Sequence, residues 1–149
     1  MNYEISSVSH DLGIVGNFAD RVAIMYAGKI VEYGTTLEVF YQAKHPYTWG
    51  LIQSIPIQGQ PLYSIPGTPP SIYQVKAGDA FFERNDYALV IDELEEPPFF
   101  KVSDTHFAAT WLLAEDAPEV IVPSNIQARY DQYEAWQLAR RDQYGTVKS

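Results

Sequence analysis

Alternating hydrophobic and polar positions near the start of the chain predict a β-hairpin. Residues 22–26 form a short apolar run with the composition of a strand. Residues 29–33 alternate like a half-buried strand, and Gly34 ends the run. Ala27 and Gly28 supply the turn that joins the two segments.

Capping residues and apolar spacing indicate three helices in the first third of the chain. Asp11 is placed to cap a short helix over residues 12–18. Thr35 or Thr36 can cap a helix directly after the hairpin. Pro46 suits the first turn of a third helix, whose apolar side chains are those of Tyr47, Trp49, Leu51 and Ile52. His45 is the expected entry residue of that helix.

The C-terminal part of the chain predicts one long helix. Ser124 can cap it, it runs to about Tyr144, and Gly145 closes it. Four apolar residues form a stripe at helical spacing, namely Ile126, Tyr130, Tyr133 and Trp136. We expect this stripe to dock on the chain's own domain, and the alternative is a helix that binds a partner or forms a dimer.

Prolines punctuate the middle of the chain, so long helices are not expected between residues 55 and 105. Residues 87–91 fit either a strand or a short helix. Residues 105–113 are typical of one short, well-buried element, and residues 120–123 of an extended linker.

Composition excludes several classes of protein. The chain has 149 residues and a formal net charge of −9, which disfavours binding to nucleic acids or anionic lipid surfaces. It has no cysteine, so disulfides and thiolate metal sites are impossible. The sequence has neither an apolar run long enough to span a membrane nor a secretory signal, which predicts an intracellular protein.

His10 is the candidate residue with chemistry. It stands in the segment Val8-Ser9-His10-Asp11-Leu12-Gly13. Two further segments follow in order, namely Ala19-Asp20-Arg21-Val22 and Met25-Tyr26-Ala27-Gly28-Lys29-Ile30-Val31-Glu32-Tyr33-Gly34. Taken alone, a single histidine after a short strand is more often structural. The ordered series, however, resembles the end of an ABC-transporter ATPase domain. The resemblance implies that His10 is the switch histidine, which contacts the γ-phosphate of ATP and helps to orient the attacking water.

The elements that would hold the nucleotide are missing from the sequence. It contains no G-x-x-x-x-G-K-[ST] phosphate-binding loop, no signature sequence and no apolar strand that ends in an acidic pair. The resemblance implies ATP and Mg²⁺ in an intact parent protein, whereas this chain alone is expected to hold no cofactor and to be inactive.

A second set of motifs indicates the branch of the family. Two segments resemble the C-terminal extension of oligopeptide and dipeptide importer ATPases, namely His45-Pro46-Tyr47-Thr48-Trp49-Gly50-Leu51 and Leu62-Tyr63-Ser64-Ile65-Pro66-Gly67-Thr68-Pro69-Pro70. In many members four cysteines of this extension bind an iron–sulfur cluster. The resemblance places Asp79, Asn85, Asp92 and Thr110 at those positions, so a subgroup without the cluster is expected.

The resemblance implies an α/β (α+β) fold in three parts. Residues 1–54 would be the end of the nucleotide-binding domain, residues 55–122 the transporter extension, and residues 123–149 a C-terminal helix and tail. The parent protein would couple ATP hydrolysis to peptide uptake at the cytoplasmic face of the membrane. Its partners would be membrane permease subunits and a second ATPase subunit.

Two expectations compete with this interpretation or extend it. The chain could instead be a stand-alone acidic protein-interaction module without nucleotide chemistry. The hairpin over residues 22–33 is expected to expose apolar surface, which would favour a homodimer. No metal site is expected, because the acidic run at residues 92–96 lacks calcium-loop spacing and His45 and His106 lack zinc-ligand spacing.

Overall fold

The predicted hairpin opens the described part of the chain. The computed structural model describes residues 20–55, 59, 64–69 and 77–144. Strand β1 (Arg21–Tyr26) pairs antiparallel with β2 (Lys29–Thr35). Ala27 and Gly28 both have positive φ, 51° and 82°, which fits a two-residue turn matched to the twist of the strands. The hairpin is therefore confirmed, and β2 continues one residue beyond Gly34.

Two strands from much later in the chain complete the sheet. Strand β4 (His106–Ala108) pairs antiparallel with β2, and β3 (Phe100–Ser103) pairs antiparallel with β4. The strand order is β1-β2-β4-β3. The mixed α/β (α+β) class is confirmed, and the sheet contains strands from both sides of the boundary predicted at residues 54 and 55.

The expectation that the hairpin lacks covering strands needs a correction. Glu32 lies opposite Ala108 and Tyr33 opposite Phe107, so β4 of the same chain occupies the edge of β2. Among the described residues β1 is an outer strand. Met25 and Ile30, paired across the hairpin, keep 54% and 42% of their surface exposed.

The two helices that follow the hairpin begin at the caps that the sequence indicates. Helix α1 (Thr36–Tyr41) has Thr35 at its N-cap, and the Thr35 and Glu38 side chains form a capping box. Helix α2 (Pro46–Gln53) has His45 at its N-cap and Pro46 in its first turn. The predicted helix over residues 12–18 and its cap Asp11 lie outside the described residues.

The proline-rich middle folds into short elements. The 3₁₀ helix η2 spans Phe82–Arg84, and helix α3 spans Val90–Leu94. Of the segment predicted as strand or helix at residues 87–91, only the last two residues are helical, as the start of α3. The single element expected over residues 105–113 is two elements, β4 and the 3₁₀ helix η3 (Trp111–Leu113). The division arises because the Thr110 hydroxyl accepts the Leu112 N–H and starts a new turn.

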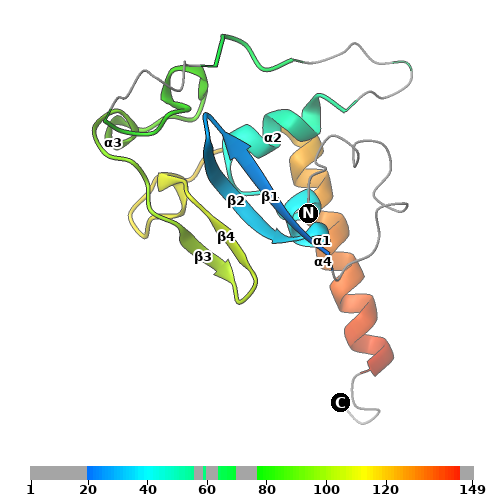
Figure 1. Ribbon diagram of the computed structural model, residues 1–149. Helices are drawn as coiled ribbons and strands as arrows, with labels where there is room; N and C mark the ends of the chain where they lie inside the picture. The colour runs from blue at the N-terminus through cyan, green and yellow to red at the C-terminus, as the bar shows by residue number, and fades with distance from the viewer. Residues whose placement is uncertain (1–19, 56–58, 60–63, 70–76, 145–149) are drawn as a thin grey trace.

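Helix α4 (Ser124–Tyr144) has the predicted bounds. It packs against α1 and α2, and its side chain Ile126 is only 1% exposed. Figure 1 shows α4 passing along both helices and extending beyond them at its C-terminal end. Docking on the chain's own helices is confirmed. No helix of the described residues is long and apolar enough to cross a membrane.

Two apolar clusters stabilise this arrangement. The first lies between the hairpin and α1 and reaches Phe81; its buried members are Ile24, Tyr26, Val31, Val39 and Phe81. The second joins α1 and α2 to α4; its buried members are Phe40, Ala43, Trp49, Ile52 and Ile126. Figure 1 shows α1, α2 and α4 gathered on one side of the hairpin, with α3 lying apart from them.

Candidate functional site

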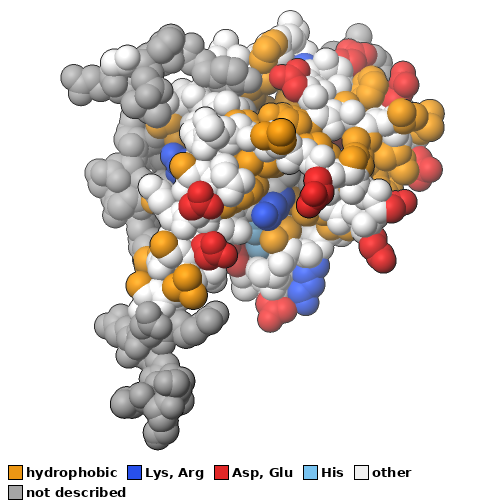
Figure 2. Space-filling model, turned by 180° about the vertical axis from the view of Figure 1, so that it is seen from behind, with side chains coloured by type: hydrophobic (Ala, Val, Ile, Leu, Met, Phe, Trp, Pro, Cys, Tyr) orange, Lys and Arg blue, Asp and Glu red, His pale blue; other side chains and the backbone are white. Residues whose placement is uncertain are grey.

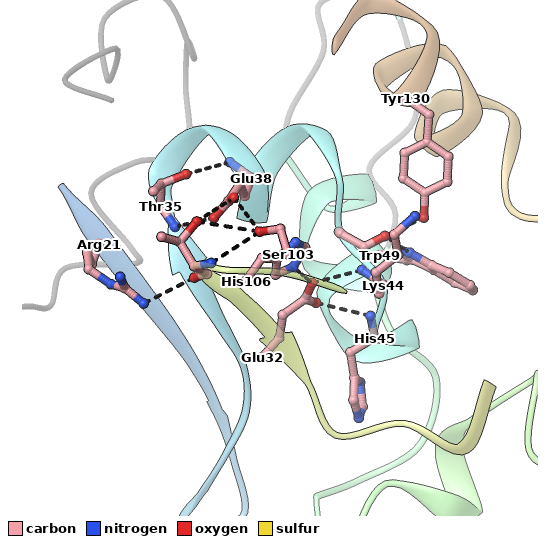
Figure 3. A network of polar contacts seen from close by, with 12 residues as sticks. Arg21, Glu32, Thr35, Glu38, Lys44, His45, Trp49, Ser103, His106 and Tyr130 are labelled. Carbon is pink, nitrogen blue, oxygen red and sulfur yellow. Dashed lines mark hydrogen bonds and ion pairs between the residues drawn. The ribbon is translucent and has the colours of Figure 1, made fainter. Parts of the chain in front are cut away.

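The most unusual polar group of the described chain is the carboxylate of Glu32, in the middle of β2. Its side chain is 0% exposed, and that of His106 on β4 is 1% exposed. His106 Nε2 lies 2.6 Å from Glu32 Oε2. The backbone N–H groups of Lys44 and His45 donate to the two Glu32 oxygens at 2.8 and 3.0 Å. Figure 3 shows these partners converging on the carboxylate from β4 and from the segment before α2.

This arrangement explains why a carboxylate is tolerated inside the protein. Removing a charge from water is unfavourable unless hydrogen bonds and an ion partner replace the lost solvation. Glu32 receives one side-chain partner and two backbone donors, each from a different position in the sequence. The Glu32–His106 contact spans 74 positions in the chain. The cluster is therefore a structural joint between the hairpin, the entry to α2 and β4.

His45 is buried beside this joint but serves a different purpose. Its Nδ1 accepts the Tyr47 N–H at 3.0 Å, which caps α2. Burial lowers the pKa of His45 to about 3, so the ring is neutral at neutral pH. The proton then sits on Nε2, and no hydrogen-bond partner for Nε2 lies among the described residues. A ring held in this state is suited to capping and packing against Phe81, 5.9 Å away between ring centroids.

A second carboxylate, Glu38 on α1, fastens the loop between β3 and β4. It accepts hydrogen bonds from the hydroxyls of Ser103 and Thr105 at 2.8 and 2.7 Å. It also accepts the Thr35 N–H at 2.9 Å. Burial alone would raise the pKa of Glu38, but the hydrogen bonds from Thr105, Thr35 and Ser103 outweigh it and lower the pKa. Glu38 is thus an ionised clamp between α1 and the β3–β4 turn.

Helix α4 is attached through the backbone carbonyl of Ala43. The Tyr130 hydroxyl and Trp49 Nε1 both donate to this oxygen, the latter at 2.8 Å. Lys44 Nζ lies 4.3 Å from the centroid of the Tyr130 ring, a cation–π distance. Burial raises the pKa of Tyr130 and keeps its hydroxyl protonated as a donor. The next residue, Lys44, donates its backbone N–H to Glu32. The segment at Ala43 and Lys44 therefore connects α4 to the Glu32 joint.

The four residues at the cysteine positions of the family extension stabilise turns. Each side chain accepts a nearby backbone N–H: Asp79 from Phe81, Asn85 from Tyr87, Asp92 from Leu89 and Thr110 from Leu112. Burial raises the pKa of Asp79 to about 6, and the charges of Asp92 and Glu96 act in the same direction. Short polar side chains thus supply local hydrogen bonds that shape this loop region.

A pocket of about 250 Å³ lies beside α2 and η2. Its cation, Arg84, is already engaged: it donates to the carbonyls of Ile65 and Pro66 and to the Tyr26 hydroxyl, at 2.9–3.1 Å. Asp86 supplies a negative charge to the same lining. The pocket does not suit a phosphate, because its cation Arg84 is already hydrogen-bonded and Asp86 would repel a negative charge. Among the described residues no group of three potential metal ligands was found.

The predicted site residue His10 lies outside the described residues, so its role as switch histidine stays a prediction. The sequence analysis did not single out Glu32, because alternation within residues 29–33 does not reveal a partner elsewhere in the chain. In the structure β2 places both Val31 and Glu32 in the interior. A strand covered on both faces gives its polar residues no route to water.

The comparisons with known proteins agree with the interpretation of the motifs. Residues 31–90 match the family model described as the oligopeptide/dipeptide transporter, C-terminal region. The chain is 54% identical over 137 residues to a dipeptide transport ATP-binding protein (DppD) of Lactococcus lactis, covering 90% of this chain and 39% of that protein. It is 56% identical over 127 residues to an oligopeptide transport ATP-binding protein (AmiE) of Streptococcus pneumoniae, covering 83% and 36%.

A third relative, an oligopeptide transport ATP-binding protein (OppD) of Bacillus subtilis, is 53% identical over 126 residues, covering 82% of this chain and 35% of the relative. The chain thus spans 35–39% of the length of these three relatives. The matched family region begins in β2, one residue before Glu32, and ends at the first residue of α3. The chain belongs to the oligopeptide/dipeptide transporter ATP-binding family, whose C-terminal region it carries.

Proposed function

We propose that this chain supplies the C-terminal region of an ATP-binding subunit that powers the uptake of oligopeptides or dipeptides. The observation that carries the proposal is the match of residues 31–90 to the transporter's C-terminal region, together with more than 50% identity to three transport ATP-binding proteins. The alternative, a stand-alone acidic interaction module, is not favoured by these relationships.

The partners in this proposal are membrane permease subunits and a second ATPase subunit. The chain would lie at the cytoplasmic face of the membrane, held there by its partners. The buried Glu32 joint supports a structural contribution, because it connects the family region to β4, which lies outside the matched residues. Buried groups of this kind hold elements in fixed positions rather than take part in chemistry with a solvent-borne substrate.

The nucleotide chemistry belongs, in this proposal, to sequence that this chain does not contain. The parent would use ATP and Mg²⁺, but the sequence has no phosphate-binding loop and Arg84 is committed to backbone carbonyls. The residues present therefore do not fit a nucleotide site. His10 would need such a site, supplied by other sequence, to act as a switch histidine.

A graft tests the proposal. The aligned portion of the L. lactis dipeptide transport ATP-binding protein is replaced by this chain, and growth on an essential dipeptide is measured in cells that lack the native gene. We expect growth with the wild-type graft and with the exposed-site variant Leu138→Ser. A graft that accumulates to the normal level at the membrane but supports no dipeptide uptake would overturn the proposed function.

A further inference from the structure

Helix α3 exposes two apolar side chains and buries an acidic one, unlike an ordinary surface helix. Val90 and Leu94 are 80% and 62% exposed, and their spacing of four places them on one face. Asp92, in contrast, is 2% exposed. An amphipathic helix on a protein surface normally buries its apolar side chains. The Val90 and Leu94 side of α3 is therefore exposed for contact with another molecule.

Backbone contacts hold helix α3 in place. Asp92 Oδ2 accepts the Leu89 N–H at 2.7 Å, which caps the start of α3. The Asp92 carbonyl accepts the Asp79 N–H at 2.7 Å. Gly78 approaches so closely that a Cβ there would lie 2.4 Å from the same oxygen. The orientation of Val90 and Leu94 is thus fixed before any partner arrives, which reduces the entropy lost on binding.

The surroundings of this face are strongly acidic. Between Asp79 and Glu96 the sequence has seven acidic residues and one basic residue, Arg84. Arg84 donates to the carbonyls of Ile65 and Pro66, and Lys29 from the hairpin pairs with Glu96 at 2.8 Å. Glu93, within α3, and Glu95, which directly follows it, remain exposed. In Figure 2 hydrophobic and acidic side chains intermingle at the right-hand edge, the side on which α3 lies.

We propose that the α3 face, defined as Val90 and Leu94 with the rim of Glu93 and Glu95, is a docking surface for a basic amphipathic segment of another protein. Charge complementarity selects this occupant. A second copy of this chain would bring the same negative charge to the contact, and an anionic lipid surface or a nucleic acid would also be repelled. Two apolar anchors on a single turn of helix predict a weak contact, with a Kd on the order of micromolar.

A pair of model peptides tests the proposal with the whole chain. The probe is a fluorescein-labelled amphipathic helix of leucine and lysine, LKKLLKLLKKLLKL, and its counterpart has glutamate in place of lysine. Fluorescence anisotropy measures both affinities at low and raised salt. We expect the lysine peptide to bind, its affinity to fall with salt, and the glutamate peptide not to bind.

Variants locate the contact. We expect the double variant Val90→Ser/Leu94→Ser to weaken binding about tenfold, and Glu93→Lys/Glu95→Lys to weaken it at least as much. The matched controls are Ile121→Ser for exposed apolar surface and Asp131→Lys/Glu134→Lys for net charge. The controls should change the affinity less than twofold. Circular dichroism checks folding, and the charge pair remains an independent test if the serine variant unfolds.

Three results would overturn the proposal. The first is equal weakening by the α4 charge controls, which shows that only net charge matters. The second is binding to vesicles of anionic phosphatidylglycerol that the α3 variants abolish, which assigns the surface to a membrane. The third is self-association in sedimentation velocity that Val90→Ser/Leu94→Ser removes, which assigns the surface to a second copy of the chain.

Discussion

Glu32 is the residue on which the contacts between distant parts of the chain depend. It binds His106 of β4 and the backbone of Lys44 and His45, all within 3.0 Å. We predict that Glu32→Ala lowers the free energy of unfolding by about 3–5 kcal/mol, because three buried donors lose their acceptor. Urea unfolding measures the change. Glu134→Ala on the exposed side of α4 is the control, and a similar small effect of both variants would contradict the structural role.

Asp79 gives a prediction about pH. Burial raises its pKa from 3.8 to about 6, so the folded chain binds this proton more tightly than the unfolded chain does. The stabilisation is full below about pH 3.8 and is lost as the pH rises through about 6. Burial also raises the pKa of Asp92, which acts in the same direction.

We therefore predict that Asp79→Asn removes part of the loss of stability that the wild type shows as the pH rises. An asparagine oxygen can still accept the Phe81 N–H, but the side chain does not ionise. The difference in unfolding free energy between the variant and the wild type should shift in favour of the variant as the pH rises from about 4 to about 8. Burial lowers the pKa of His45, so its contribution to stability changes with pH in the opposite direction. Because both proteins contain His45, comparing them at each pH cancels this contribution. A difference that stays constant over this range would contradict the assignment.

At the residue scale, local signals in the sequence were sufficient for caps and insufficient for the buried joint. The pair Thr35 and Thr36, of which Thr35 is the cap, and the helix start at His45 and Pro46 were identifiable, because a capping residue acts on the backbone within a few positions. Glu32 was not, because its partner His106 lies 74 positions away. His10, the candidate from the family resemblance, lies outside the described residues.

At the scale of elements, the cap of α1 provides a quantitative test. The Thr35 hydroxyl accepts the Glu38 N–H at 3.2 Å, and the Glu38 carboxylate accepts the Thr35 N–H at 2.9 Å. We predict that Thr35→Ala lowers the free energy of unfolding by about 0.5–2 kcal/mol, while Thr35→Ser changes it much less. Chemical denaturation of the two variants measures the difference. Equal stability of the alanine and serine variants would show that the cap contributes nothing.

The elements that sequence patterns predicted are those with local signals. The hairpin, α1, α2 and α4 each have a turn, a cap or a helical stripe within their own segment. The addition of β4 to β2 was not predicted, since strand pairing over a long separation leaves no periodic trace in either strand. The strand that covers the β2 edge of the hairpin was missed for the same reason, whereas the apolar Met25 and Ile30 are exposed as expected.

At the scale of the whole molecule, the described residues form one interlocked arrangement. The sheet combines strands from residues 21–35 and 100–108, and α4 packs on α1 and α2. The division into parts at residues 54 and 122 stays a prediction, and contacts among the described residues cross both positions. The family could be inferred from ordered motifs such as the one around His45, and the comparisons confirm it.

We propose that this chain serves a nucleotide-driven transporter without holding the nucleotide itself. Isothermal titration of the purified chain with Mg-ATP tests it most directly, because the sequence contains no phosphate-binding loop. We expect no saturable heat in the micromolar range, while the full-length L. lactis relative serves as the positive control. Saturable binding of Mg-ATP to this chain at micromolar concentration would show that the chain holds the nucleotide itself.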